Sequence, residues 1–332
     1  MNPSRREALA RELEKAELVY RALVELGGRA TIDEVARCAQ MPREETYYIM
    51  TKLNERGFLV RERDESTLLL YFRVVRELKP EELLGIDVYI PPGEPDIYAR
   101  ARRVKALIDR HGFRADLIGA CKVHLTAYPH HRRLTVDVDV VAASEDEAVE
   151  LVKLLLQSMS LKPYGGWIID FKLGFTDREG GIDVSSIGLK KSRNNILWRF
   201  WNYFKNYRGL LLEHTLVSKL MRPYFDPVTD GYDVLKSLVY SDVEMLVKLT
   251  GDAYAQAGEY ALSIGDNLRM FLNYYELVKD NVKDKEGEEL KRDLELAKKI
   301  LDEYRRTSMR RLGFATALFE RFSPNCHSRI TI

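Results

Sequence analysis

The chain has 332 residues, 45% of them hydrophobic, with 52 Lys and Arg against 51 Asp and Glu. This length and apolar content allow a sizeable core, divided among two or three domains. The near-zero net charge excludes bulk positive charge as the means of holding a nucleic acid. Any such partner needs a local basic patch.

The cysteines and the hydropathy pattern indicate the cellular compartment of the protein. Cys38, Cys121 and Cys326 are odd in number and far apart, so they lack the spacing of a zinc site or a disulfide framework. No apolar run approaches the roughly 18 residues that a membrane-spanning helix needs, and the first residues form a charged helix rather than a signal peptide. We therefore expect a cytoplasmic protein with no membrane partner.

The N-terminal residues predict a long helix, a pair of shorter helices and a β-hairpin. A first helix over residues 5–27 ends at two glycines, and Thr31 then caps a short helix over 32–40. Met41-Pro42 separates it from a second helix over 43–57, and residues 58–74 read as two strands around the polar turn 64–66. From about Glu12 to Val75 this layout resembles the winged helix-turn-helix superfamily, which implies an N-terminal domain over residues 1–78.

Two interpretations of this domain remain open. In the first, the second helix and the wing contact DNA through a set of basic and aromatic residues, namely Arg43, Tyr47, Tyr48, Lys52, Arg56, Arg61 and Arg63. Acidic residues on the same elements dilute the positive field, namely Glu44, Glu45, Glu55, Glu62 and Asp64. In the second, the winged helix contacts protein or serves as a scaffold.

Residues 79–98 contain four prolines and two glycines among acidic residues, so they predict a linker with little structure. A helix over residues 99–112 follows and ends at Gly112. After it, a short apolar strand at Leu117-Ile118 leads into Gly119-Ala120-Cys121 and a short helix.

The segment 133–141 (RLTVDVDVV) predicts a strand with two carboxylates on one side. Side chains alternate along a strand, so Asp137 and Asp139 point to the same face, opposite three valines. Two ionised carboxylates this close are unfavourable unless a cation neutralises them, and Mg²⁺ prefers such hard oxygen ligands. The alternative is a half-exposed strand whose solvent face happens to carry Thr and Asp.

A later hairpin supplies a third carboxylate. Residues 167–189 read as two strands joined by the turn Arg178–Gly181, with Asp183 early in the second strand. A hairpin brings its strands into register with a sheet, so we expect Asp183 to reach the face of Asp137 and Asp139. Asp170 and Asp177 are competitors, but one belongs to the earlier strand and the other adjoins the turn.

The order of these elements resembles the DNA polymerase β-like nucleotidyltransferase superfamily. Downstream, residues 210–242 are similar to the motif of the abortive-infection type E toxin nucleotidyltransferases, in which a helical Lys is followed by an Arg and an Asp-x-x-Asp. On that match Lys219 and Arg222 take the basic positions, and Asp230 and Asp233 take the acidic ones. The chain departs from the family at Gly119-Ala120-Cys121, where two glycines or Gly-Ser is usual, and at Thr229, where a Lys is common.

The resemblance implies a mechanism. Asp137 and Asp139 would hold Mg²⁺ that bridges the phosphates of a nucleoside triphosphate, and Asp183 would bind a second metal or accept the proton of the attacking hydroxyl. Lys219 would contact the triphosphate, and Asp233 would orient Lys219 or the nucleotide. The remaining predicted nucleotide-binding residues are Gly119, Cys121 and Arg222. For Lys219 an ordinary solvated helix lysine is the alternative.

Residues 188–214 interleave basic and aromatic side chains, a combination that holds single-stranded RNA through phosphate contacts and base stacking. Leu197, Trp201, Phe204 and Leu211 recur at near-helical spacing, which favours core packing instead. A further small basic segment, residues 130–133, precedes the aspartate strand. It is interpreted either as an exposed loop or as a contact to phosphates.

Together these features predict an α+β protein: a winged helix over 1–78, a linker over 79–98, a nucleotidyltransferase core with a small mixed sheet over 99–250 and a helical C-terminal region over 251–332. The predicted activity is Mg²⁺-dependent transfer of a nucleotide from a nucleoside triphosphate to a hydroxyl of RNA, including transfer RNA, or of a protein. A toxin-like role is an analogy from the family. The rival hypothesis is a non-enzymatic winged-helix DNA-binding regulator with a degenerate nucleotidyltransferase domain.

Overall fold

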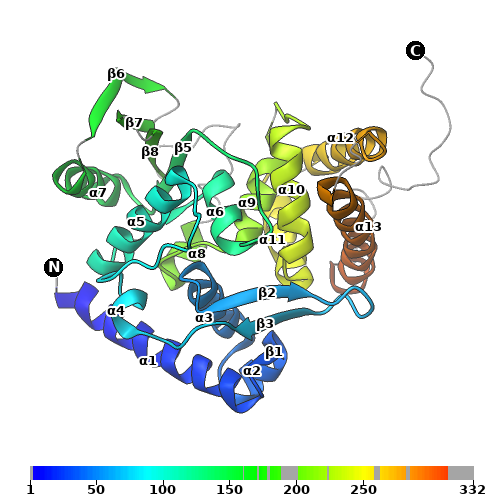
Figure 1. Cartoon of the computed structure of the whole chain (residues 1–332), viewed down its shortest axis with the longest axis horizontal. Helices are drawn as coiled ribbons and strands as arrows, with labels where there is room; N and C mark the ends of the chain where they lie inside the picture. Colours follow the sequence, from blue (N-terminus) through cyan, green and yellow to red (C-terminus); the bar gives the residue numbers. More distant parts are fainter. Residues whose placement is uncertain are drawn as a thin grey trace. The chain divides into compact units, whose positions relative to one another are not determined.

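The computed structural model describes residues 3–159, 161–169, 172–177, 180–187, 201–222, 224–257, 262–281 and 285–312. The chain divides into two compact units, Met1–Leu212 and Glu213–Ile332 (Figure 1). In the described residues the strands belong to the first unit and the second unit is helical. The protein therefore has the predicted mixture of helices and small sheets.

The N-terminal module is a winged helix. It comprises α1 (Pro3–Glu25), β1 (Arg29–Thr31), α2 (Ile32–Cys38), α3 (Arg43–Glu55), β2 (Leu59–Arg63) and β3 (Leu70–Val74). The three strands form an antiparallel sheet in the order β1-β3-β2, and β2 and β3 are the two sides of the wing.

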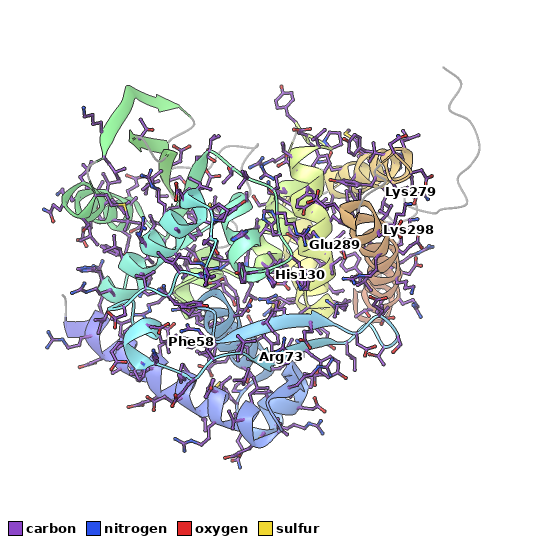
Figure 2. All side chains as sticks on the ribbon, in the orientation of Figure 1. Phe58, Arg73, His130, Lys279, Glu289 and Lys298 are labelled. Atoms are coloured by element: carbon purple, nitrogen blue, oxygen red, sulfur yellow. The ribbon has the colours of Figure 1, made fainter. Side chains whose placement is uncertain are left out.

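Local sequence explains where these helices begin. Thr31 caps α2 as predicted, because its hydroxyl accepts from the backbone N–H of Glu34 while the Glu34 carboxylate accepts from the backbone N–H of Thr31. Phe58, labelled in Figure 2, is fully buried just before β2 and anchors the wing to the module. The helix pair and the hairpin thus follow from capping and from apolar spacing.

A five-stranded mixed sheet follows. Its strands are β4 (Ala115–Leu117), β5 (Asp137–Ala142), β6 (Lys162–Ile169), β7 (Lys172–Asp177) and β8 (Gly180–Ser186), in the order β4-β5-β8-β7-β6. The central pair β5 and β8 is parallel, whereas β4 with β5, β7 with β8 and β6 with β7 are antiparallel. The predicted hairpin that carries Asp183 is β7 and β8.

One face of this sheet is apolar and covered by helices. Val138 and Val140 of β5 and Ile182 and Val184 of β8 are at most 1% exposed. They pack in one core with α5 (Asp96–His111), α6 (Gly119–Thr126) and α7 (Glu145–Ser158). Ala142 of β5 belongs to the same core. Because side chains alternate along a strand, Asp137 and Asp139 of β5 and Asp183 of β8 face away from it.

The segment 79–98 is packed rather than a free linker. It contains α4 (Pro80–Leu83), and Arg76 pairs with the carboxylate of Glu82 at 2.6 Å. Gly85 lies so close to α5 that a Cβ at its position would be 2.1 Å from the carbonyl oxygen of Ala106. Only glycine fits there, and its positive φ of 69° is also one that favours glycine. The Pro and Gly content therefore marks a close packing contact.

A largely buried set of charges joins the winged helix to the sheet-bearing part of the first unit. We call it the junction network; its members are Glu12, Lys52, Glu55, Arg56, Lys105, Asp109, Asp116, Lys122 and Arg208. Lys105 lies 3.3 Å from Asp109 and 3.0 Å from Asp116, and Lys122 lies 2.9 Å from Asp116. Arg56 also donates to the carbonyl oxygen of Lys105 at 3.0 Å.

Burial alone would raise the pKa of the Asp109 carboxyl. The attraction of Lys105, and then of Lys52 and Arg56, outweighs burial and holds this pKa well below the ordinary aspartate value of 3.8. Asp109 is therefore charged in the folded protein, and its charge is matched by three cations from both sides of the junction.

The second unit consists of α9 (Leu212–Leu220), α10 (Thr229–Tyr240), α11 (Val243–Ala257), α12 (Leu262–Val278) and α13 (Lys285–Leu312), where α9 begins one residue before the unit boundary. Helices α10 and α11 both pack on α13, and buried Lys236 pairs with Asp293 and Glu289 of α13. Lys279 and Lys298 (Figure 2) both pair with Glu276 of α12. No helix in the described part of the chain is long and apolar enough to cross a membrane.

Replacing Asp109 tests the junction network. We expect Asp109→Asn to lower the free energy of unfolding by about 3–5 kcal/mol at pH 7, because it leaves buried cations without their partner. Because the folded pKa is depressed, the contribution of Asp109 is fully present above its ordinary pKa of 3.8 and is lost as the pH falls through the lower folded value. Urea unfolding of both proteins from pH 7 to pH 2 measures this difference.

Asp33→Asn is the matched control, since Asp33 pairs with Arg43 at 2.8 Å but its side chain is 63% exposed. Exposed pairs contribute little to stability, so this variant should unfold like the unmodified protein. Equal losses in the two variants, or a difference that grows toward acid, would contradict the proposed role of Asp109.

Candidate metal centre

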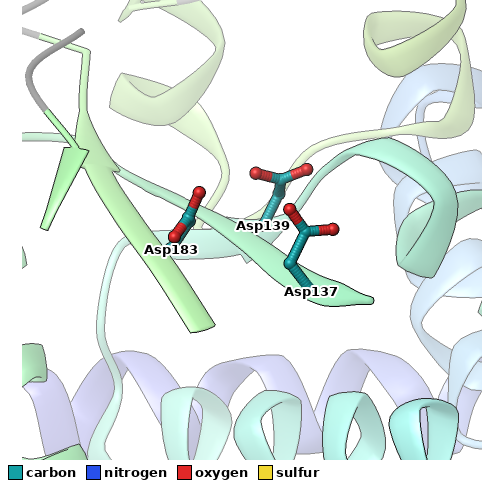
Figure 3. A group of neighbouring side chains, drawn as sticks. All are labelled: Asp137, Asp139 and Asp183. Carbon is teal, nitrogen blue, oxygen red and sulfur yellow. The ribbon is translucent and has the colours of Figure 1, made fainter. Parts of the chain in front are cut away.

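Three carboxylates meet on the face of the sheet opposite the core. One carboxylate oxygen from each of Asp137, Asp139 and Asp183 lies within 4.8 Å of the other two, and all three residues are half-buried. Asp139 is the register partner of Asp183 across the parallel strands β5 and β8. Figure 3 shows the three side chains projecting to the same side of the two strands. The predicted triad is therefore brought together.

Gly119 approaches this cluster from the turn between β4 and α6. Its φ is 65°, and a Cβ there would lie 2.9 Å from Oδ2 of Asp139. The adjoining backbone is tied to β5, because the N–H of Ile118 donates to the carbonyl oxygen of Asp139 at 2.9 Å. The positive φ favours glycine at this position, which the sequence predicted for nucleotide binding, and any larger residue would also displace the Asp139 carboxylate.

The first turn of α6 begins at Gly119 and no side chain caps it. The first amides of a helix have no partner inside the helix and carry partial positive charge, which suits an anion. Cys121, also predicted to bind the nucleotide, is 1% exposed, and its Sγ lies 3.5 Å from the carbonyl oxygen of Asp137. The side chain of Cys121 thus belongs to the core, so any contact of this residue with a phosphate would come from its backbone.

Thr135 is a neighbour of the triad to which the sequence analysis gave no role. Its hydroxyl donates to Oδ1 of Asp137 at 2.9 Å and fixes the orientation of that carboxylate. The alternation along the strand had already placed Thr135 on the aspartate face, so this pattern was the available signal. Of the competitors, Asp170 lies outside the described residues, and Asp177 is the register partner of Gly180 at the end of the hairpin.

The donor set fits magnesium. Octahedral Mg²⁺ with Mg–O distances of about 2.1 Å holds its ligands at most about 4.2 Å apart. Carboxylate oxygens within 4.8 Å of one another reach this spacing after small side-chain rotations. The carboxylates also repel one another on a strand whose other face is buried, and a divalent cation relieves that repulsion.

The second unit holds the Lys-Arg-Asp-x-x-Asp motif as a cluster of its own. Nζ of Lys219 lies 2.7 Å from Asp230 and 2.9 Å from Asp233, and Arg222 lies 2.9 Å from Asp230. Lys219, Asp230 and Asp233 are buried, whereas the side chain of Arg222 is 47% exposed. Lys219 is therefore not an ordinary solvated lysine, and Asp233 is placed to orient it.

Most residues predicted to face DNA are buried. In α3 every residue from Thr46 to Glu55 is buried, which includes Tyr47, Tyr48 and Lys52. Arg56 is 7% exposed and belongs to the junction network. The direct DNA contacts assigned to these side chains are therefore wrong in this conformation, because α3 packs against α1 and α6.

The wing arginines were also assigned to phosphates. Arg61 is 1% exposed, because it donates to Asn54, Tyr47 and Thr51 at 2.8–3.1 Å. Its assignment is wrong for the same reason. Arg63 is half-buried and donates to the carbonyl oxygen of Leu68. Exposed positive charge on this module instead includes Arg29 and Arg73 (Figure 2), both of which pair with Glu62.

The two predicted basic regions are only partly described. Residues 188–200, with most of the basic and aromatic set, lie outside the described residues, as do the side chains of Trp201 and Lys205. Phe204 and Leu211 are buried, as the core interpretation predicted. In the loop 130–133, His131 is buried and Arg132 is exposed.

Comparison with known proteins bears on the N-terminal module. Residues 12–78 match the family model described as the sugar-specific transcriptional regulator TrmB. No curated protein and no solved structure matches the chain. The module is thus a winged helix of the type found in a family of transcriptional regulators, which supports DNA binding, and the match ends before the five-stranded sheet.

Magnesium binding to the triad is testable by thermal unfolding. Mg²⁺ that binds only the folded state stabilises it by about 2.7 kcal/mol at 100 times its Kd, so we expect the melting temperature to rise with Mg²⁺ concentration. The variant Asp137→Asn with Asp139→Asn should lose this rise. Without metal it should melt higher than the unmodified protein, because the repulsion among the carboxylates is reduced.

Asp146→Asn, an exposed change in the first turn of α7, is the control and should keep the full response to Mg²⁺. If Mg²⁺ shifts all three proteins equally, or none of them, the triad is not the metal site.

Proposed function

We propose that this chain is a Mg²⁺-dependent nucleotidyltransferase that moves a nucleotide from a nucleoside triphosphate to a hydroxyl acceptor. The observation that carries the proposal is the convergence of Asp137, Asp139 and Asp183 beside Gly119 and the uncapped start of α6. Hard oxygen ligands thus adjoin a helix start suited to phosphate, and both are needed to place a metal-bound triphosphate.

Each residue has a distinct part in this reaction. Asp137 and Asp139 would hold the metal, and the Thr135 hydroxyl orients the Asp137 carboxylate by a hydrogen bond. Magnesium bound there would offset the negative charge that develops on the leaving pyrophosphate. Asp183 would complete the ligand set of the metal or accept the proton of the acceptor hydroxyl. The oxygen of that hydroxyl bonds to the α-phosphorus while the bond to pyrophosphate breaks. The resemblance alone supports a phosphate contact by Lys219 and Arg222, and RNA, transfer RNA and protein remain the acceptor classes.

The direct test is transfer of label. We expect the protein, incubated with Mg²⁺, each α-labelled nucleoside triphosphate and total RNA or protein, to label one acceptor. Asp137→Asn with Asp139→Asn should reduce the rate by more than about 100-fold, since even residues that only support metal ligands commonly cost 10–100-fold. Asp146→Asn should retain full activity. The unmodified protein should also retain full activity when any co-purified RNA is removed before the acceptor is added.

A second candidate function is a DNA-binding transcriptional regulator, and the match over residues 12–78 favours it. The family match supports this candidate, and it does not extend to the five-stranded sheet. Its working surface would be the winged helix, with exposed Arg29 and Arg73 or an α3 released from the junction.

The two candidates differ in which residues matter. If regulation is the function, the protein binds a selected duplex DNA with equal affinity before and after Asp137→Asn and Asp139→Asn, and no label is transferred to any acceptor. Duplex binding measured by fluorescence anisotropy at 150 mM salt, beside the transfer assay, separates them. Transfer that is lost in the aspartate variant would exclude a purely regulatory protein.

A further inference from the structure

The first unit has a hollow at the opposite end of β4 from Gly119. It has a volume of about 590 Å³, within the range of ligand sites. We call it the arginine groove; the residues that matter for its chemistry are Arg5, Arg11, Arg114, Glu147, Tyr207 and Arg208. They come from α1, from the residue before β4, from α7 and from the segment after α8 (Trp201–Asn206).

The groove is separate from the carboxylates. Arg114 stands just before β4, where its carbonyl oxygen accepts from Ala143, and Gly119 stands just after β4 beside Asp139. The four residue steps of extended chain from Arg114 to Ile118 span roughly 13 Å. A ligand in the arginine groove would therefore not occupy the metal centre.

The groove carries an excess of positive charge. Arg5 pairs with Glu147 and Glu150 at 3.1 Å, and Arg208 pairs with Glu12. Arg11 and Arg114 are exposed, and neither forms an ion pair with any residue that the structure describes. Cations that converge from distant parts of the chain repel one another unless an anion joins them.

Arg208 supplies a further sign of a missing partner. Its Nη1 is buried and has no hydrogen-bond partner among the described residues, while Nη2 donates to Glu12. Nη1 lies against Gly112, where a Cβ would be 3.3 Å away. A buried donor without an acceptor costs free energy, and a ligand oxygen or a water would satisfy it. The fork of an arginine side chain suits phosphate oxygens in particular.

Tyr207 adds an aromatic surface to these cations. Its ring contacts those of Tyr48 and Tyr203, with centroids 4.7 Å and 4.6 Å away, and it is half-buried. These contacts hold the ring in place while part of it lines the groove. A fixed aromatic ring beside arginines is the arrangement that stacks a base while its phosphate is held.

From these observations we infer that the arginine groove binds a nucleotide through its phosphate, with the base against Tyr207. The phosphate belongs either to a free nucleotide or to one unit of a single strand, and both present the same chemistry to Arg11, Arg114 and Arg208. This inference concerns a site other than the metal centre, so it does not depend on nucleotidyl transfer.

The test measures binding without Mg²⁺ in the Asp137→Asn, Asp139→Asn background, so that the metal centre does not contribute. One probe is adenosine monophosphate, followed by calorimetry, and the other is a fluorescein-labelled single-stranded hexanucleotide, followed by anisotropy. We expect at least one probe to bind, and the Kd to rise about tenfold or more in Arg11→Ala with Arg114→Ala. Tyr207→Leu should also weaken binding, but it should change the salt dependence of binding less than the double arginine variant does.

For the hexanucleotide, each phosphate contact removed should reduce the slope of log K against log salt by about 0.7. Arg6→Ala is the matched control, because Arg6 is an exposed arginine of α1 outside the groove, and it should leave the Kd unchanged. If the monophosphate binds, a free nucleotide is a sufficient ligand for the groove. If only the hexanucleotide binds, the ligand is a single strand. Failure of both probes to bind, or equal weakening by Arg6→Ala, overturns the inference.

Discussion

The junction network is the interaction on which the arrangement of the first unit depends. Four carboxylates and five cations leave water together, a change that is costly unless every charge meets its partner with good geometry. The partners come from both sides, since Glu55 of α3 meets Lys122 of α6 and Arg56 meets Asp109 of α5. Neither the winged helix nor the sheet domain can satisfy these charges alone, so the two fold as one compact unit.

The same network positions the candidate metal centre. Asp116 of β4 is held by Lys105 and Lys122 and accepts from the backbone N–H of Leu210 at 2.6 Å. β4 leads directly into Gly119, and the register of β4 on β5 fixes where Gly119 meets Asp139. A chain of rigid contacts therefore runs from the winged helix through β4 to the carboxylates, although no residue of the winged helix belongs to the triad.

The sequence predicted those features that depend on local spacing. Alternation along β5 placed Asp137 and Asp139 together, the hairpin brought Asp183 to them, and the capping box at Thr31 marked the start of α2. Features that depend on distant partners were missed. Lys52 and Arg56 have the composition of DNA contacts, and only the fold shows that Glu12 and Asp109 neutralise them.

The arginine groove was missed for the same physical reason. Arg11, Arg114 and Arg208 lie about 100 residues apart along the chain, and no periodicity links them. The boundary at Leu212 reflects packing of α10 and α11 on α13, which pairs residues more than 50 positions apart. The Pro and Gly content of residues 79–98 predicted a free linker. The same composition is also found where the backbone packs closely, as Gly85 does against α5.

The chemistry of α3 reconciles the regulator-like module with its buried helix. Basic residues that would contact phosphates in a DNA-bound winged helix here contact carboxylates, so Glu12 and Asp109 offer Lys52 and Arg56 the negative charge that a duplex would otherwise supply. DNA must therefore displace the carboxylates that pair with Lys52 and Arg56 before it reaches α3. Other parts of the same chain, α1 and α6, already pack against α3. The contact is buried, so salt screens it far less than it screens DNA phosphates. The sheet domain therefore competes with DNA for α3. Exposed residues of the module include Arg29 of β1 and residues 65–67 in the turn of the wing.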